Sequence, residues 1–215
     1  MTGSEGAAGA DGAAPLVNIL GERVALGPLR RDLVPRYLRW VNDFGMAHNF
    51  GQVRPLTEEQ ERAWYDRQVA AEHTATFTVY ERATWRPIGT ANLNTIDHRN
   101  GTATYGVGIG EGDCRGKGYG TAVTRLMLDY AFTAVGLHSV MLIAFAYNRA
   151  GLRAYARAGF RECGRRREAY RLAGHRWDIV YMECLATDFT SPVLGALLAP
   201  DAPQAAAGGG ADDRG

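Results

Sequence analysis

Lysine is almost absent from this chain of 215 residues. Lys117 is the only one, and arginine supplies the rest of the 24 basic side chains. Acidic side chains number 23, which leaves a formal net charge of +1 at pH 7. A chain with so little excess charge has no global field to hold a nucleic acid or an anionic membrane, so any anion site must be local. We therefore expect neither nucleic acid nor membrane as a partner.

Cysteine and long apolar runs are also scarce. Cys114, Cys163 and Cys184 are an odd number without close spacing, which argues against a disulfide framework and against a CxxC zinc or redox site. The longest apolar run, Val140 to Tyr147, is too short to span a membrane. The residues after Met1 lack the basic and apolar regions of a secretory signal. These absences predict a cytoplasmic protein with reduced thiols and no bound metal.

Both ends of the chain have compositions that do not support a packed core. Residues 1–15 are mostly Gly, Ala and acidic or hydroxyl residues, and residues 190–215 end in a run rich in Ala, Gly and Asp. Such segments bury too little apolar surface to offset the entropy lost on ordering. We predict disordered tails over 1–15 and 190–215, and a single folded domain over 16–189.

Hydrophobic periodicity and turn signals predict alternating helices and strands, an α/β order. Helices are predicted over 31–42, 57–70, 120–136 and 149–158, and strands over 23–26, 76–80, 88–96, 102–109, 140–146, 160–170 and 176–185. Thr57 and Gln60 form a capping box that should begin the second helix. Asn100-Gly101 should turn the third strand back into the fourth. The continuous apolar run 140–146 predicts a strand buried on both faces.

The most informative segment is a glycine-rich loop between a predicted strand and a predicted helix, residues 106–121. Glycines let the backbone approach a ligand closely, and the first N–H groups of a helix have no partner within it, so such a loop suits a phosphate. The dinucleotide fingerprint fails because Thr121 stands at its third glycine, and the nucleotide P-loop fails at two positions. The pattern that fits is Arg-x-x-Gly-x-Gly, from Arg115 to Gly120, with Lys117 adding positive charge.

Two segments around this loop resemble the GCN5-related N-acetyltransferase superfamily, and within it the branch of ribosomal-protein and spermidine acetyltransferases. They are CRGKGYGTAVTRLMLDYAF and LHSVMLIAFAYNRAGLRAYARAGF, in the family's order and separation, with weaker support from YLRWVND and WDIVYMECL. The resemblance covers about residues 23–185. It implies a single domain with a twisted, mixed, mainly antiparallel sheet flanked by helices and splayed open between its fourth and fifth strands. It also implies acetyl-coenzyme A as co-substrate.

The resemblance assigns roles to individual residues. The pyrophosphate of the coenzyme would be held by Arg115, Gly116, Lys117, Gly118, Tyr119, Gly120 and Thr121. The backbone of Val107 and Ile109 would bind the pantetheine arm, which Asn148 would also contact while remaining a candidate N-cap. Tyr155 would donate its proton to the coenzyme A thiolate. Candidates for lining the acceptor pocket are Phe44, His48 and Tyr105.

One departure from the family pattern concerns the general base. Many relatives hold a glutamate on the fourth strand where this chain has Thr104, and threonine cannot act as a base near neutral pH. Asp97, His98, Glu111 or a water chain are the substitutes. Polyamines also need an acidic pocket, but the obvious acidic cluster, Glu58-Glu59-Glu61, is better explained by the first turn of a capped helix. We therefore expect no single side-chain base, and acceptor amines of low pKa in preference to spermidine.

The resulting prediction is an acetyl-coenzyme A-dependent N-acetyltransferase that acts by direct transfer. Its acceptor would be the primary amine of a small molecule, such as an amino sugar or an antibiotic-like compound, or a peptide or protein N-terminus. The alternative is a non-catalytic coenzyme A-binding sensor or structural protein of the same fold, suggested only by the missing glutamate. The prediction leaves room for a homodimer.

Overall fold

The computed structural model describes residues 14–52 and 54–200. Its centre is an eight-stranded sheet in the order β1-β2-β3-β4-β5-β6-β8-β7. The strands are β1 (Ile19–Leu20), β2 (Val24–Pro28), β3 (Ala75–Glu81), β4 (Pro87–Asp97), β5 (Thr102–Ile109), β6 (Ser139–Phe145), β7 (Arg161–Leu172) and β8 (His175–Leu185). Neighbouring strands pair antiparallel except β5 and β6, which are parallel. The predicted mixed, mainly antiparallel sheet is confirmed.

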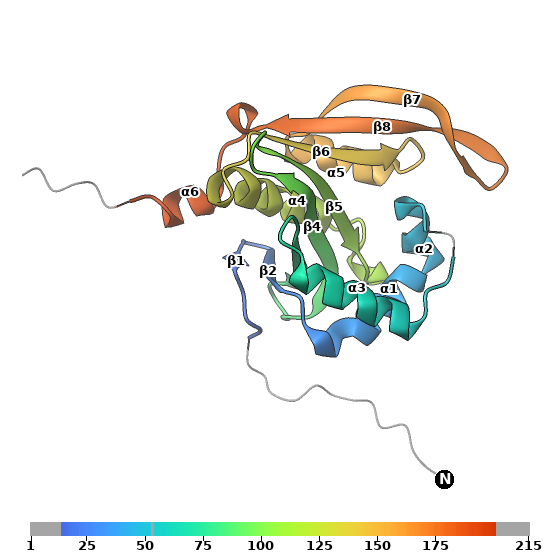
Figure 1. The fold of residues 1–215 in the computed structure, drawn as a ribbon, viewed down its shortest axis with the longest axis horizontal. Coiled ribbons are helices and arrows are strands. Elements are labelled where there is room, and N and C mark those ends of the chain that lie inside the picture. Colours follow the sequence, from blue (N-terminus) through green and yellow to red (C-terminus); the bar gives the residue numbers. More distant parts are fainter. Residues whose placement is uncertain (1–13, 53, 201–215) are drawn as a thin grey trace, which may run out of the picture.

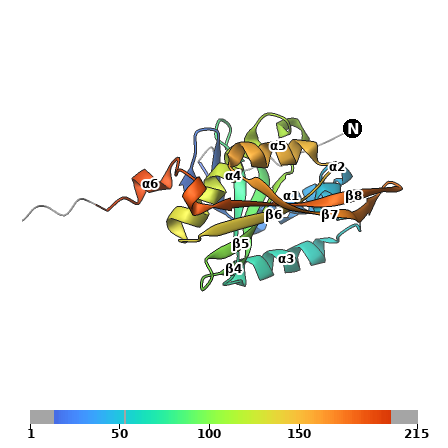
Figure 2. The same ribbon diagram turned by 90° about the horizontal axis from the view of Figure 1, so that it is seen from above.

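Helices cover the two faces of this sheet unequally. They are α1 (Val34–Asn42), α2 (Phe44–Ala47), α3 (Glu58–Ala70), α4 (Tyr119–Asp129), α5 (Arg149–Ala158) and α6 (Leu194–Leu197). Helices α4 and α5 pack together on one face, and α3 lies on the other (Figure 2). No helix among residues 14–52 and 54–200 is long and apolar enough to cross a membrane.

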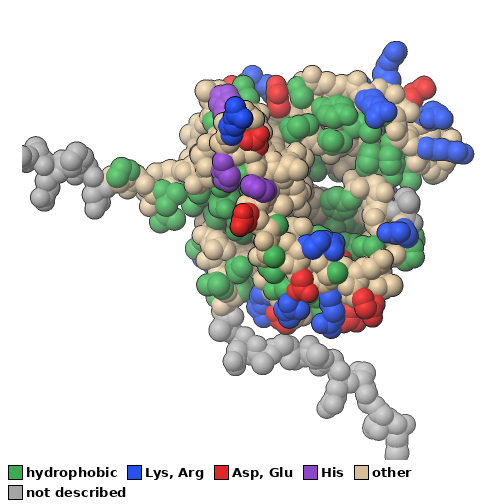
Figure 3. Space-filling model, viewed as in Figure 1, with side chains coloured by type: hydrophobic (Ala, Val, Ile, Leu, Met, Phe, Trp, Pro, Cys, Tyr) green, Lys and Arg blue, Asp and Glu red, His purple; other side chains and the backbone are tan. Residues whose placement is uncertain are grey.

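The sheet splits open between β5 and β6. These strands pair only from Thr102–Thr104 to Ser139–Met141, although β5 continues to Ile109 and β6 to Phe145. Figure 1 shows β6 and β8 diverging from β4 and β5, and Figure 3 shows the molecule hollowed between these two parts. Because the short strand β1 precedes all the strands predicted from the sequence, β5 and β6 are the fourth and fifth predicted strands. The predicted splay is confirmed. It leaves the edge of β5 that faces β6 without a strand partner over its second half, so backbone groups there are open to a ligand.

Local sequence signals predicted the turns and helix starts well. The capping box is present, because Gln60 N–H donates to Thr57 Oγ1 at 3.4 Å and Thr57 N–H donates to Gln60 Oε1 at 3.0 Å. The turn at Asn100-Gly101 connects β4 to β5, with Gly101 at a φ of +64°. The turn between β7 and β8 falls at Ala173-Gly174, between the last two predicted strands. Each signal lies within a few residues and so survives any tertiary context.

The prediction that the strand at 140–146 is buried on both faces is wrong. Burial alternates along β6, and the Ile143 side chain is 52% exposed. Helices α4 and α5 cover only one face at this end of the sheet (Figure 2). A continuous apolar run therefore occurs here in a strand covered on one side, a case that periodicity alone cannot separate from full burial.

The predicted disorder of the C-terminal tail is wrong for residues 190–200. The fully buried Asp129 carboxylate of α4 accepts hydrogen bonds from Ser191 Oγ and from the N–H groups of Val193 and Leu194, the last two at 2.9 Å. Leu194 of α6 is itself 4% exposed. A buried carboxylate needs donors, and this segment supplies them. The rest of this tail, 201–215, and residues 1–13 of the other lie outside the described residues.

Two apolar clusters hold the elements in place. The larger lies between the sheet and helices α4 and α5; among its fully buried members are Leu26, Val79, Ile88, Leu93, Val123 and Met127. The smaller lies under α1 and comprises Leu29, Val34, Tyr37, Trp40, Met46 and Tyr65. The smaller cluster fixes α1 and α3 above β4 and β5, so it positions one side of the site described below.

Candidate active site

A groove of about 290 Å³ begins at the open edge of β5 and reaches the N-terminal ends of α4 and α5. Most residues predicted to contact the coenzyme line it: Val107, Ile109, Arg115, Gly116, Gly118, Gly120, Thr121, Asn148 and Tyr155. The side chains of Lys117 and Tyr119 do not. Lys117 is exposed and its carbonyl accepts a hydrogen bond from Arg23, while the Tyr119 hydroxyl donates to Glu81 at 2.6 Å. Neither residue lines the groove, so their contact with the coenzyme stays a prediction.

The loop before α4 offers backbone N–H groups to an anion. Gly116 and Gly118 have φ values of +74° and +85°, which let the chain turn sharply into the helix. The first N–H donor of this helix turn is Ala122, which bonds the Gly118 carbonyl at 3.2 Å. The amides from Tyr119 to Thr121 therefore precede the first intrahelical bond, at the positive end of the helix dipole. This arrangement suits a phosphate group.

Two arginines that sequence reasoning missed add positive charge to the groove. Arg153 and Arg157 of α5 both line it, and no carboxylate lies among its lining residues within the described chain. Their i, i+4 spacing on a predicted helix was the available signal. The Arg115 guanidinium, in contrast, is already engaged, since it donates to the carbonyls of Ile109 and Gly110 and pairs with Asp43 at 2.7 Å. The groove suits a polyanionic ligand.

Tyr155 projects into this groove from α5. Its ring packs edge to face against Tyr105, at 6.4 Å between centroids, and against Phe160, at 6.3 Å. Burial raises the pKa of Tyr155 to about 12, so the hydroxyl keeps its proton at neutral pH. Asn148 lies nearby at the start of the same helix, where its Oδ1 accepts from the Gly151 N–H at 2.9 Å. Asn148 thus caps the helix and also lines the groove.

The placement of Tyr105 in the acceptor pocket is wrong. Its side chain is 4% exposed and its hydroxyl is hydrogen-bonded to Thr124 Oγ1 of α4 at 3.0 Å. Alternate residues of a strand point to opposite faces, and this residue falls on the face that α4 covers. Burial raises the pKa of Tyr105 well above 10. Its role in the fold is to support the ring of Tyr155.

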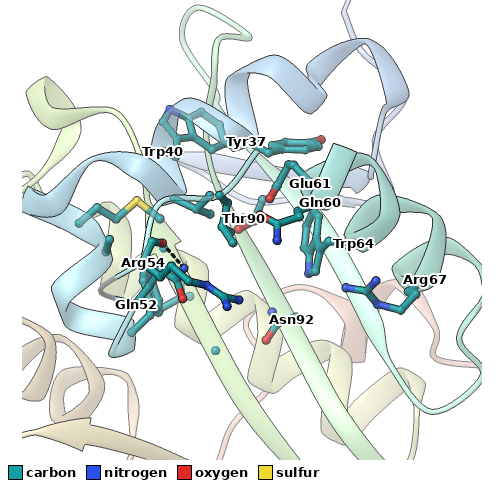
Figure 4. Close-up of a pocket in the computed structure, with 18 of the residues that line it drawn as sticks. Tyr37, Trp40, Gln52, Arg54, Gln60, Glu61, Trp64, Arg67, Thr90 and Asn92 are labelled. Atoms are coloured by element: carbon teal, nitrogen blue, oxygen red, sulfur yellow. Dashed lines mark hydrogen bonds between the residues drawn. The ribbon is translucent and has the colours of Figure 1, made fainter. Parts of the chain in front are cut away.

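A second cavity, of about 640 Å³, lies across β4 and β5 from α4. Its floor is formed by Thr90, Asn92 and Asn94 of β4 and by residues 106–108 of β5. Aromatic side chains of α1 and α3 form its opposite wall: Tyr37, Trp40 and Trp64 (Figure 4). Gln52, Arg54, Gln60 and Arg67 add polar groups. The cavity combines aromatic walls with hydrogen-bonding groups, as small-molecule sites do.

The other two predicted acceptor residues do not line this cavity either. Phe44 is 66% exposed, and the His48 ring lies with Nδ1 2.6 Å from the Phe44 carbonyl oxygen and stacks on Tyr147. Their neighbours Met46 and Phe50 line the cavity instead. The segment therefore contributes to this cavity through residues 46 and 50 and not through the two predicted residues.

The two cavities meet at the backbone of β5. Met46, Phe50, Val107 and Gly108 line both of them. A Cβ atom added to Gly108 would lie 2.5 Å from Met46 Cε and 2.8 Å from Phe50 Cζ, so these side chains rest directly on the strand. A ligand in the groove and a ligand in the second cavity would therefore approach each other at residues 107 and 108.

Among the described residues, the one carboxylate that lines the second cavity is Glu61, which is only 3% exposed. Burial raises the pKa of this carboxyl to about 7. The sequence had assigned it only to the first turn of a capped helix. The signal that could have found it is its spacing, since Glu61 lies three residues before Trp64 and seven before Gln68, on one face of the helix.

None of the base candidates named from the sequence lines either cavity. Asp97 lies in the β4–β5 turn, where hydrogen bonds from Asn100 lower its pKa. His98 is exposed in the same turn. Glu111 accepts from Trp40 Nε1 and pairs with Arg36 and Arg39. Within the described part of the chain, no group of three or more His, Cys, Asp or Glu side chains is placed to hold a metal ion.

A split mixed sheet, with an N–H-rich loop on one side of the gap and a second cavity across the strand, can bring two ligands together at one backbone segment. The profile of the acetyltransferase (GNAT) domain matches residues 23–161, more than half of the chain. The chain belongs to this family.

Known proteins agree with this assignment. The human alpha/beta-tubulin-N-acetyltransferase 9 is 32% identical over 131 residues, which are 55% of this chain and 63% of that protein. An uncharacterized N-acetyltransferase, p20 of Bacillus licheniformis, is 25% identical over 113 residues, 53% of this chain and 63% of that protein. The chain thus spans less than two thirds of the length of the curated relatives it matches.

A solved structure shares the fold closely. The spermidine N-acetyltransferase of Vibrio cholerae, crystallised with CoA and spermine, superposes with a TM-score of 0.72 over 78% of this chain and 98% of that chain. Its sequence identity is 21%, so this likeness shows the fold alone.

Gly120→Val should weaken binding of coenzyme A at least tenfold, because a branched side chain would fill the groove at the start of α4. Gly120→Ala is the matched control. The nearest heavy atom to an added Cβ is Ala154 Cβ at 3.8 Å, and Gly120 has no positive φ, so alanine fits without strain. Isothermal calorimetry with coenzyme A measures both. Equal affinities for the two variants and the wild type would remove the loop from the binding site.

Proposed function

We propose that this protein is an acetyl-coenzyme A-dependent N-acetyltransferase that binds the coenzyme in the 290 Å³ groove and the acceptor amine in the 640 Å³ cavity. The observation that carries the proposal is that the two cavities lie on opposite sides of β5 and meet at Val107 and Gly108. Two ligands brought to one backbone segment are held for direct reaction, which removes much of the entropic barrier to transfer.

Different residues of the groove would bind different parts of the coenzyme. The amides from Gly116 to Thr121, with Arg153 and Arg157, would bind its phosphates. The unpaired edge of β5 would bind the amides of the pantetheine arm as a further strand would, and Asn148 lies beside that path. Tyr155 would protonate the thiolate that leaves when the thioester breaks.

The thiol of the groove is poorly suited to carry the acetyl group. Cys114 lines it but is 1% exposed, and its Sγ accepts a hydrogen bond from Arg86. Burial raises the pKa of this thiol above its usual value, which lowers the fraction of reactive thiolate. These features favour direct transfer to the amine over a covalent intermediate on the enzyme.

The acceptor cavity favours a single amine on a polar body. A polyamine carries several positive charges and needs several carboxylates, whereas this cavity has Glu61 together with Arg54 and Arg67. Its amides and aromatic walls match hydroxyl and carbonyl groups and the apolar faces between them. These contacts support an amino sugar, an antibiotic-like amine or a peptide N-terminus as the acceptor class. Cytoplasmic location and a homodimer remain predictions.

In a panel of amines, an amino sugar and a short peptide with a free N-terminus should exceed spermidine in kcat/KM at least tenfold at pH 7. A peptide α-amine has a pKa of about 8, so far more of it is neutral than of an alkyl amine with a pKa of about 10. Release of free thiol from acetyl-coenzyme A, followed with a disulfide dye, measures each rate. Preference for spermidine would refute the acceptor class and leave acetyl transfer standing. Coenzyme binding without thiol release from any amine would instead favour the non-catalytic alternative.

A further inference from the structure

Glu61 differs from the other acidic residues in the same helical turn. Glu58 pairs with Arg62 in solvent and Glu59 is exposed, whereas Glu61 is 3% exposed. Within residues 14–52 and 54–200, no ion pair or side-chain hydrogen bond engages the Glu61 carboxylate. Among the described residues, the buried side-chain oxygens without a hydrogen-bond partner are Thr74 Oγ1 and the Tyr80 hydroxyl, so the Glu61 oxygens keep access to the cavity that this residue lines. Removing a carboxylate from most of its water without giving it a partner costs free energy, and it leaves the group free to bind a ligand.

The position of Glu61 relates it to the meeting point of the two cavities. Figure 4 shows its side chain pointing into the acceptor cavity toward Thr90 on the floor. Thr90 is the direct partner of Gly108 in the β4–β5 ladder, and Gly108 belongs to the wall that both cavities share. Glu61 therefore faces the acceptor side of the place where the thioester would lie.

The other titratable groups that line this cavity among the described residues do not pair with Glu61. From α1 comes Tyr37, whose hydroxyl is hydrogen-bonded to Thr78 at 2.6 Å. From the loop before α3 comes Arg54, and from α3 itself comes Arg67. Strands β4 and β5 contribute no titratable side chain to the cavity, only Thr, Asn, Gly and Val. Burial alone raises the pKa of Glu61 to about 7, the range in which a side chain exchanges protons best at neutral pH.

We propose that Glu61 is the catalytic base of the acetyl transfer, accepting the proton of the acceptor ammonium directly or through one water. The inference rests on the proposed function. The ammonium gives one proton to the Glu61 carboxylate and becomes a neutral amine. The amine nitrogen attacks the thioester carbonyl, the new C–N bond forms and the C–S bond breaks. The thiolate takes a proton from Tyr155, the nitrogen loses its second proton to restore that hydroxyl through solvent, and Glu61 releases its proton to bulk water.

This assignment replaces the expectation that no single side chain serves as the base. Thr104 stands on β5 where many relatives hold a glutamate, and it lines neither cavity. A carboxylate supplied from α3, across the cavity, does the same chemistry from the opposite wall. The base of this enzyme is thus carried by a different element of the fold.

The test compares Glu61→Gln with Glu59→Gln, an exposed glutamate two residues away in the same turn. For the acceptor used best by the wild type, Glu61→Gln should lower kcat/KM about 10²-fold to 10³-fold at pH 7 and leave the KM for acetyl-coenzyme A unchanged. The wild-type profile should show an enzyme group titrating near pH 7. In Glu61→Gln this limb should vanish and the rate should rise steadily toward the pKa of the acceptor. Glu59→Gln should match the wild type. A Glu61→Gln enzyme with the wild-type rate and profile would overturn the assignment.

A second measurement separates this inference from the proposed function. Carbon-13 NMR of the chain labelled at glutamate carboxyls should show one carboxyl titrating near pH 7 in the wild type and in Glu59→Gln, and none there in Glu61→Gln. Absence of that titration refutes the assignment even if the wild type acetylates amines. A wild type that binds coenzyme A by calorimetry but releases no thiol with any amine refutes the proposed function, and the assignment with it.

Discussion

Replacing Tyr155 with phenylalanine should lower kcat by a factor of about 10² to 10⁴ and leave coenzyme binding nearly intact. The substitution removes only the hydroxyl, because the ring keeps its edge-to-face contacts with Tyr105 and Phe160. Without that proton donor the thiolate must leave as an anion, with no side-chain acid to protonate it. Steady-state kinetics at saturating acetyl-coenzyme A and calorimetry with coenzyme A measure the two quantities.

Tyr130→Phe is the matched control for this experiment. Tyr130 is another tyrosine whose pKa is raised by burial, and it lines neither cavity. Its variant should keep the wild-type kcat. Because the pKa of Tyr155 is about 12, the loss in Tyr155→Phe should be the same from pH 6 to pH 9. Retention of most of the kcat in Tyr155→Phe would reduce this residue to a packing role.

Relative to the wild type, the Glu61→Gln variant should become more stable as the pH rises. The Glu61 carboxyl has a pKa of about 7 in the folded protein, against 4.5 for the unfolded reference. Between these values this site binds more protons in the folded chain than in the unfolded chain, so the contribution of Glu61 to wild-type stability is fully present below pH 4.5 and is lost as the pH rises through 7. Glutamine does not titrate. The free energy of unfolding of the variant relative to the wild type should therefore rise by about 2 to 3 kcal/mol from pH 5 to pH 8.

Urea unfolding at the two pH values measures this difference, with Glu59→Gln as the control. Hydrogen bonds within its own helical turn lower the pKa of Glu59, so removing that side chain cannot produce a gain that grows with pH in this range. A constant difference between Glu61→Gln and the wild type from pH 5 to pH 8 would mean that Glu61 is ionised throughout and already solvated in the folded protein.

The features that could be predicted from the sequence are those determined by residues close together in the chain. The capping box at Thr57 and Gln60 acts over a single helical turn, and the turn at Asn100-Gly101 depends on its own backbone. The glycine loop from Gly116 to Gly120 was recognised because an N–H-rich helix start needs nothing else to attract an anion. These parts of the fold and of the groove were within reach of the sequence alone.

What it could not predict depended on contacts between distant segments. The environment of Glu61 depends on α1 packing against α3, and its spacing to Trp64 indicates a shared helix face without saying which element covers that face. The docking of residues 190–200 depends on the buried Asp129, more than sixty positions earlier in the chain. Tyr105 was assigned to the wrong face because a pattern interrupted by Gly106 and Gly108 gives no reliable inward side.

The wall shared by Met46, Phe50, Val107 and Gly108 has a consequence for the design of inhibitors. A compound that joins an amine-bearing head to the sulfur of coenzyme A through a short linker would occupy both cavities at once. Because the two halves are joined, binding of one half raises the effective concentration of the other at its cavity, which increases the overall affinity without any new contact. The coenzyme half would be common to many related enzymes, so selectivity would come from the head. Its fit to the aromatic and amide-lined acceptor cavity, rather than to the phosphate loop, would decide which member of the family is inhibited.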